Sequence, residues 1–131
     1  MTETKRWVVN HCLGPLGLGT MVAVPRRHVV RVAELNDEEA SELGPLLKRI
    51  ASKLTALTTS EQVYVCLWSH GGSEGKHLHW IIQPVSTETV RRYGGLRSEA
   101  LQAAMFEAGE YPEDRAIEEF CAQARLTFEA S

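Results

Sequence analysis

Residues 62–84 read QVYVCLWSHGGSEGKHLHWIIQP, and they predict two strands joined by a glycine-rich loop. Residues 62–68 are almost continuously apolar, with the β-branched and aromatic side chains typical of a central strand covered on both faces. The second strand is expected at 77–84 and stops at a proline. A short loop between two such strands indicates neighbours in an antiparallel sheet.

The second of these strands carries a pair of histidines. Side chains alternate between the two faces of a strand. One face of 77–84 should therefore present His77, His79, Ile81 and Gln83, while Leu78, Trp80 and Ile82 pack on the other. Two imidazoles on one face, directly after a glycine loop, indicate a functional site more than a structural pair.

Two kinds of chemistry suit this pair. A His-x-His strand can hold zinc if a third ligand is present, and the candidates are His70, His11 and Glu74. Alternatively, a neutral imidazole can attack phosphorus if its second nitrogen is held by a hydrogen-bond acceptor. Backbone N–H groups of the glycine loop could then converge on a phosphate. The residues alone leave both interpretations open.

The rest of the chain predicts an α+β fold with an antiparallel sheet of about five strands. Earlier strands are expected at 6–10 and 18–24, and helices at 98–108 and 113–126. Asn36, followed by acidic residues and by Glu39 at the third helical position, is a helix N-cap signature. One long helix should run from there to Leu57, and Gly44-Pro45 predicts either a local kink or a true start nearer Pro45. We expect one domain, 1–131.

Composition limits the possible partners. The chain has 131 residues and a formal net charge of −3, which argues against binding duplex DNA. No apolar run approaches a membrane span and no secretory pattern opens the chain, so a cytoplasmic location is expected. The three cysteines are widely separated and are interpreted as reduced thiols.

Several segments together resemble the histidine triad family of nucleotide hydrolases and transferases, whose signature alternates histidine with apolar residues. The His77 and His79 pair fits that signature. So do a strand that ends at Asn10, the segment 19–28 (GTMVAVPRRH) and the helix start at 35–39. The resemblance covers most of the chain.

The resemblance implies roles for individual residues. His79 would attack the α-phosphate of a nucleotide and form a covalent nucleotidyl-histidine, with His77 supporting the site. Asn10 would contact the ribose, and apolar residues around Trp7 and Leu18 would line the base pocket. Gly72 and Ser73 would bind phosphate. The family also implies a homodimer, and the apolar surface of the 37–57 helix favours one; no metal or other cofactor is expected.

Two residues depart from the family pattern. Ile81 replaces the third histidine and cannot donate a proton, although Gln83, two positions further on, could partly replace that donor. Glu74 would repel a phosphate unless it pairs with Lys76 or His70. The alternatives to an active nucleotidyl hydrolase or transferase are therefore a nucleotide-binding module that has lost catalysis and a metal-dependent enzyme that uses the histidine pair.

Overall fold

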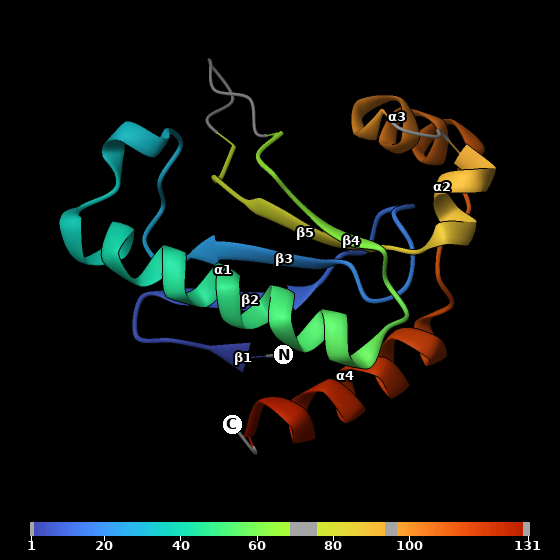
Figure 1. The fold of residues 1–131 in the computed structure, drawn as a ribbon. Helices are drawn as coiled ribbons and strands as arrows, with labels where there is room; N and C mark the ends of the chain where they lie inside the picture. Colours follow the sequence, from blue (N-terminus) through green and yellow to red (C-terminus); the bar gives the residue numbers. More distant parts are fainter. Residues whose placement is uncertain (1, 69–75, 94–96, 130–131) are drawn as a thin grey trace.

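The computed structural model describes residues 2–68, 76–93 and 97–129. Its centre is a five-stranded sheet in the order β1-β2-β3-β5-β4, with every neighbouring pair antiparallel (Figure 1). The strands are β1 (Thr2–Glu3), β2 (Trp7–His11), β3 (Met21–Pro25), β4 (Gln62–Cys66) and β5 (Trp80–Val85). The expected α+β class and antiparallel sheet are confirmed, and the two-residue β1 was not predicted.

The sequence predicted a strand over 77–84, but in the structure β5 begins at Trp80, so the segment 77–79 lies outside it. The last pair between β3 and β5 joins Ala23 to Trp80, and β3 ends at Pro25, which has no N–H to donate. The Leu78 N–H instead donates to the Val29 carbonyl at 2.7 Å. The histidine pair thus lies in extended chain that leads into β5.

The long helix α1 (Asp37–Leu57) begins at the predicted cap. The Asn36 side chain accepts a hydrogen bond from the Glu39 N–H at 2.8 Å, and the Glu39 carboxylate accepts one from the Asn36 N–H at 2.9 Å. Pro45 lies inside this helix, so the helix continues through the expected kink position.

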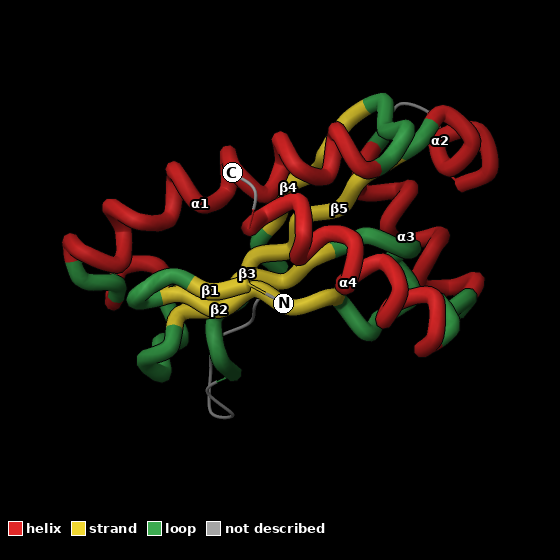
Figure 2. Tube along the Cα trace, turned by 90° about the horizontal axis from the view of Figure 1, so that it is seen from below, coloured by secondary structure: helices red, strands yellow, loops and turns green. Residues whose placement is uncertain are grey.

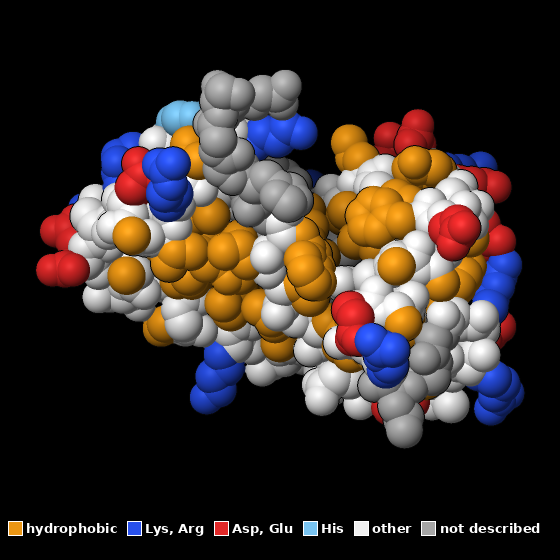
Figure 3. All heavy atoms as spheres, turned by 90° about the horizontal axis from the view of Figure 1, so that it is seen from above, with side chains coloured by type: hydrophobic (Ala, Val, Ile, Leu, Met, Phe, Trp, Pro, Cys, Tyr) orange, Lys and Arg blue, Asp and Glu red, His pale blue; other side chains and the backbone are white. Residues whose placement is uncertain are grey.

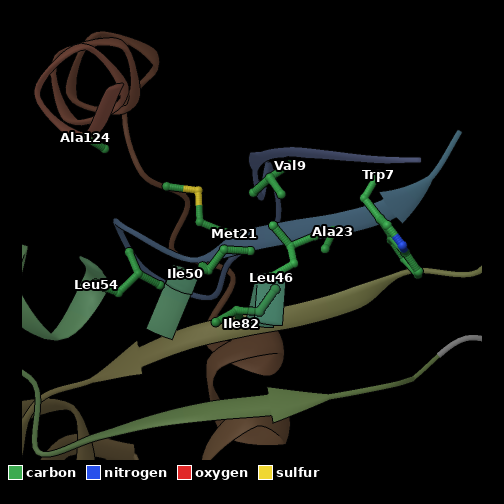
Figure 4. Packing of buried hydrophobic residues seen from close by; sticks show 9 residues of the cluster. All are labelled: Trp7, Val9, Met21, Ala23, Leu46, Ile50, Leu54, Ile82 and Ala124. Atoms are coloured by element: carbon green, nitrogen blue, oxygen red, sulfur yellow. The ribbon is translucent and has the colours of Figure 1, made fainter. Parts of the chain in front are cut away.

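The main core lies between α1 and one face of the sheet. Figure 4 shows α1 side chains directed toward those of β2, β3 and β5. Fully buried members include Ile50 and Leu54 from the helix and Val9, Met21 and Ile82 from the strands. Burying each such side chain is worth about 1.5–3 kcal/mol, so this cluster fixes α1 on the sheet.

Three further helices complete the fold: α2 (Thr87–Tyr93), α3 (Ser98–Ala108) and α4 (Asp114–Glu129). Ala124 of α4 joins the main core beside α1. Figure 2 shows α2 and α3 near one end of the sheet. Here Leu101 and Met105 of α3 pack with Ile81 and Val85, whose side chains leave the sheet face opposite to α1. None of the helices in the described part of the chain combines the length and apolar character that a membrane-spanning segment needs.

Candidate active site

The histidine pair is held in place by the residue between its members. Leu78 is buried at 2% exposure, and its N–H is tied to Val29, which is also buried. The flanking His77 and His79 are only partly buried. The two imidazoles are therefore attached to an anchored backbone, at the entrance to β5.

A hydrogen bond within the pair orients the second imidazole. Nδ1 of His79 lies 3.2 Å from the carbonyl oxygen of His77. A carbonyl can only accept, so Nδ1 carries the proton and donates it, and Nε2 of the neutral ring keeps its lone pair. This is the arrangement that a nucleophilic histidine needs.

His28 is a third histidine at this site, and the sequence reasoning gave it no role. Its ring lies against that of His77, with centroids 5.2 Å apart and planes inclined by 49°. Nε2 of His77 is buried and has no hydrogen-bond partner among the described residues. In the sequence, His28 is marked only by its position three residues after Pro25, the last residue of β3. Only the fold shows that the chain after β3 brings His28 against His77.

Asn10 lies on the open sheet face beside the pair. It is paired with Val22 across β2 and β3, and Val22 is paired with Ile81 across β3 and β5. Directly paired residues share a face, so these three side chains form one row across the sheet. Two strand spacings, about 10 Å, separate Asn10 from β5. Asn10 thus lies on the sheet face opposite to α1, two strands from β5, and its contact with the ribose stays a prediction.

The expected base-pocket residues are placed elsewhere. Trp7 is fully buried on the α1 face, where its ring packs against Trp80 and its indole N–H donates to the Glu39 carbonyl at 3.0 Å. Trp7 and Asn10 are three positions apart on one strand and so face opposite sides. Leu18 lines a cavity at the far end of β5. The alternation of side chains along β2, read from the sequence alone, could already have excluded Trp7 from the face that carries Asn10.

Half-buried valines occupy the face that carries Asn10. Val8 and Val24 are directly paired across β2 and β3. They lie two residues along the strands from the pair of Asn10 and Val22, and therefore on the same face of the sheet. Their apolar surface is suited to a flat, weakly polar group such as a nucleobase. Val8 follows Trp7 directly and so belongs to the apolar residues around Trp7 that were expected to line the base pocket.

The Gln83 side chain is fully buried in the interior and hydrogen-bonded there. Its Nε2 donates to the Leu16 carbonyl at 3.0 Å, and its Oε1 accepts from Gln102 of α3 at 2.9 Å. The predicted contact between Gln83 and phosphate would require these bonds to break. This placement corrects the expectation that Gln83 lies open beside the ligand.

Ile81 is also covered. It is 7% exposed and belongs to the apolar cluster formed with Leu16, Val85, Leu101 and Met105. Position 81, which the resemblance predicts to replace a third histidine, therefore serves to pack α3 against the sheet. It presents no proton donor to a ligand.

Among the described residues, no third metal ligand accompanies His77 and His79. His11 is buried in β2, with Nδ1 2.6 Å from the Cys12 carbonyl and Nε2 accepting from the Gly19 N–H at 2.8 Å. Burial lowers the pKa of His11, so it stays neutral in this setting. No group of three histidine, cysteine or acidic side chains suited to a metal occurs in residues 2–68, 76–93 and 97–129.

The loop candidates lie outside the described residues. These are Gly72 and Ser73, expected to bind phosphate, and His70 and Glu74, considered as metal ligands.

Arg27, which follows β3, is engaged elsewhere, because its guanidinium binds the Glu39 carboxylate at 2.8 Å and the Glu34 carbonyl at 2.7 Å. The Arg27 guanidinium and the Asn36 N–H together lower the pKa of Glu39.

Solved structures that share this fold include several described as histidine triad or Hit-like proteins. A Hit-like protein involved in cell-cycle regulation from Bartonella henselae aligns with a TM-score of 0.69 and 14% identity, over 95% of this chain and 82% of that one. A hypothetical histidine triad nucleotide-binding protein from Sulfolobus tokodaii gives 0.68 and 17%, over 98% and 82%. A zinc-bound histidine triad family protein from Mycobacterium smegmatis gives 0.67 and 14%, over 99% and 86%.

These similarities define the fold of the chain as histidine-triad-like. No protein-family model matches the sequence, and no curated protein matches it at a significant level. Any assignment of activity therefore depends on the site itself.

Proposed function

We propose that this protein binds a nucleotide on the open sheet face beside the histidine pair and transfers or hydrolyses its nucleotidyl group through His79. The observation that carries the proposal is the hydrogen bond from Nδ1 of His79 to the His77 carbonyl. It fixes the tautomer in which Nε2 is a nucleophile. The Sulfolobus tokodaii structure, described as a nucleotide-binding protein, supports the ligand class.

The reaction would proceed in two displacements. The lone pair of His79 Nε2 attacks the α-phosphorus and forms a P–N bond, while the P–O bond to the leaving group breaks and its electron pair departs with that oxygen. Water or another acceptor hydroxyl then attacks phosphorus, loses a proton to solvent and displaces the imidazole. The carbonyl of His77 stabilises the positive charge that forms on the ring in the first step.

The remaining contacts complete the proposal. Asn10 would bind the ribose, and Val8 with Val24 would lie under the base, because all three share the face that His79 approaches. His77 and His28 would support the nucleophile through their ring contact. Gly72 and Ser73 stay proposed phosphate ligands. A cytoplasmic location stays a prediction from the sequence.

A binding experiment tests the ligand class. Nucleoside monophosphates at a hundredfold excess over the dissociation constant should raise the free energy of unfolding by about 2.7 kcal/mol. Asn10→Ala should weaken this effect, and Asn36→Ala should not, since Asn36 caps α1 instead. Absence of stabilisation by any nucleotide would refute the proposal.

A nucleotide-binding module without catalysis is the second candidate, and the burial of Ile81 favours it. A general acid contributes about 10²–10⁴ in rate, and the third signature position cannot supply one here. Tight nucleotide binding with no turnover of any nucleotide substrate would favour this candidate.

We also propose a homodimer formed through β4. This strand lies at the edge of the sheet, and the apolar Val65 and Leu67 are 45% and 36% exposed. Figure 3 shows apolar side chains gathered on this side of the molecule. Exposed apolar edge strands invite pairing with another chain, and twofold pairing is the commonest kind. Light scattering should give twice the chain mass of 14.6 kDa, and the Val65→Lys variant should have the mass of a single chain.

A further inference from the structure

A half-open cavity of about 140 Å³ lies at the other end of β5 from the histidine pair. It is bounded by Pro84 and Ser86, five and seven residues beyond His79 and thus about 17–23 Å away along an extended chain. The connection between β2 and β3, the connection between α1 and β4, and α3 supply its other walls. The cavity is therefore separate from the proposed nucleotide site.

Half of the residues that line this cavity carry a hydroxyl group, and together they are called its hydroxyl wall. These residues are Thr58, Thr59, Ser60, Ser86 and Thr89. None of the described residues that line the cavity carries a charge. The lining therefore offers no partner for a phosphate, a carboxylate or an amine, and it favours a neutral ligand.

The hydroxyl of Ser60 is the clearest sign of a missing partner. Its Oγ is buried and makes no hydrogen bond in the described structure. Most buried polar atoms in proteins are paired, because leaving one unpaired costs about 1–3 kcal/mol. Rotation of the Ser60 side chain about its Cα–Cβ bond would turn this hydroxyl toward the cavity, where a ligand hydroxyl would satisfy it.

The other hydroxyls offer both donors and acceptors. Thr58 donates its proton to the Leu54 carbonyl at 2.6 Å and keeps its oxygen lone pairs. The hydroxyls of Ser86 and Thr89 are 3.0 Å apart, so one proton lies between them and the second is free to point elsewhere. Only a ligand that both donates and accepts matches this wall, and a hydroxyl group does both.

The apolar residues of the lining, called its apolar wall, are held in position. They include Leu16 and Met105, which are 2% and 7% exposed. The Gln83 amide donates to the Leu16 carbonyl at 3.0 Å and to the Met105 sulfur at 3.2 Å. A cavity of this size accommodates a six-membered ring. Hydroxyls on one wall and apolar groups on the other match a ring with C–H groups and hydroxyls.

We propose that this cavity binds a small neutral polyhydroxy compound, either a polyol or a single sugar ring. The hydroxyl wall selects the ligand's O–H groups, and the Leu16 and Met105 wall covers its C–H groups. Because the walls are already positioned by hydrogen bonds, little ordering is needed on binding.

The test is an NMR titration of the full chain with glycerol, D-ribose and inorganic phosphate as separate probes. Glycerol or D-ribose should shift the amide resonances of Leu18, Ser60 and Ser86 saturably, and phosphate should not. Ser60→Ala should weaken binding about threefold to tenfold, as expected for one lost hydrogen bond. Ser60→Leu should abolish binding by filling the cavity.

Thr55→Ala is the matched control, because this exposed hydroxyl of α1 lies outside the cavity and donates to the Ala51 carbonyl at 2.8 Å. It should bind both neutral probes like the parent. The proposal is overturned if neither neutral probe binds saturably, if phosphate alone binds, or if Ser60→Ala and Thr55→Ala bind equally. His79→Ala should leave the titration unchanged, which separates this site from the nucleotide site.

Discussion

The side-chain amides of Gln102 and Gln83 are hydrogen-bonded across the interface between α3 and the sheet, with Nε2 of Gln102 donating to Oε1 of Gln83 at 2.9 Å. Oε1 of Gln102 also accepts from the Trp68 indole at 2.8 Å. Both glutamines are buried, at 5% and 0% exposure. These bonds attach α3 to β5 and to the chain that follows β4.

Replacing Gln102 should therefore destabilise the fold. Gln102→Leu leaves the buried Gln83 oxygen without this donor, at a cost of about 1–3 kcal/mol, and also removes the acceptor of the Trp68 N–H, whose residue is 56% exposed. Urea denaturation should show this loss, whereas Glu107→Gln on the exposed side of the same helix should change stability by less than about 0.5 kcal/mol. Equal stability of both variants would contradict the role of the amide pair.

The stability of the protein should depend on the protonation of His11. Burial lowers the pKa of this imidazole below its ordinary 6.5, so the unfolded chain takes up a proton at a higher pH than the folded chain does. Stability is then complete above about pH 6.5 and falls as the pH is lowered toward the folded-state pKa. Urea midpoints between about pH 7.5 and 5.5 measure this loss.

His11→Asn provides the control for that titration, because it removes the ionisable group. It should lower stability at neutral pH and flatten the dependence between about pH 7.5 and 5.5. If His11→Asn keeps the parent's slope, the assignment to His11 is wrong.

Arg27 should matter for folding and Arg26 much less. Arg27→Ala leaves the buried Glu39 carboxylate without its guanidinium partner and should cost about 1–3 kcal/mol. Arg26 forms an exposed pair with Glu3, and Arg26→Ala should cost less than about 1 kcal/mol. Nucleotide affinity should be the same in both. A selective loss of affinity in Arg27→Ala would show that this arginine binds the ligand.

Substrate choice should follow from the burial of Ile81. Without a general acid at this position, substrates with acidic leaving groups should react far faster than phosphoramidates, whose amine needs a proton to depart. The logarithm of the rate should fall steeply with the pKa of the leaving group. A flat dependence in the parent would mean that another residue donates the proton.

Restoring the signature with Ile81→His should not rescue phosphoramidate cleavage, because the new imidazole would enter the apolar cluster under α3. Burying a polar group there without a partner costs roughly 1–3 kcal/mol, so a lower melting temperature is expected. Ile81→Val should retain the parent's leaving-group dependence. Rapid phosphoramidate turnover by a stable Ile81→His variant would show that this position reaches the leaving group.

The sequence predicted most of the fold because its signals were local. The Asn36 cap, the 37–57 helix and the 98–108 helix depend on neighbouring residues, and the structure reproduces them. The errors concern tertiary packing. The alternation that groups Gln83 with His79 cannot reveal that α3 covers the far half of that face. Likewise, the contact between His28 and His77 joins residues 49 positions apart, and no local pattern encodes it.

The central claim is that Nε2 of His79 becomes covalently attached to the nucleotide. The direct measurement is mass spectrometry of the rapidly quenched protein after incubation with a nucleotide substrate, with the modified peptide mapped at neutral pH. We predict one nucleotidyl group on His79, labile to acid as a phosphoramidate is, and absent from His79→Ala although this variant binds nucleotide within about tenfold of the parent. Turnover without any such adduct, undiminished in His79→Ala, would contradict the account.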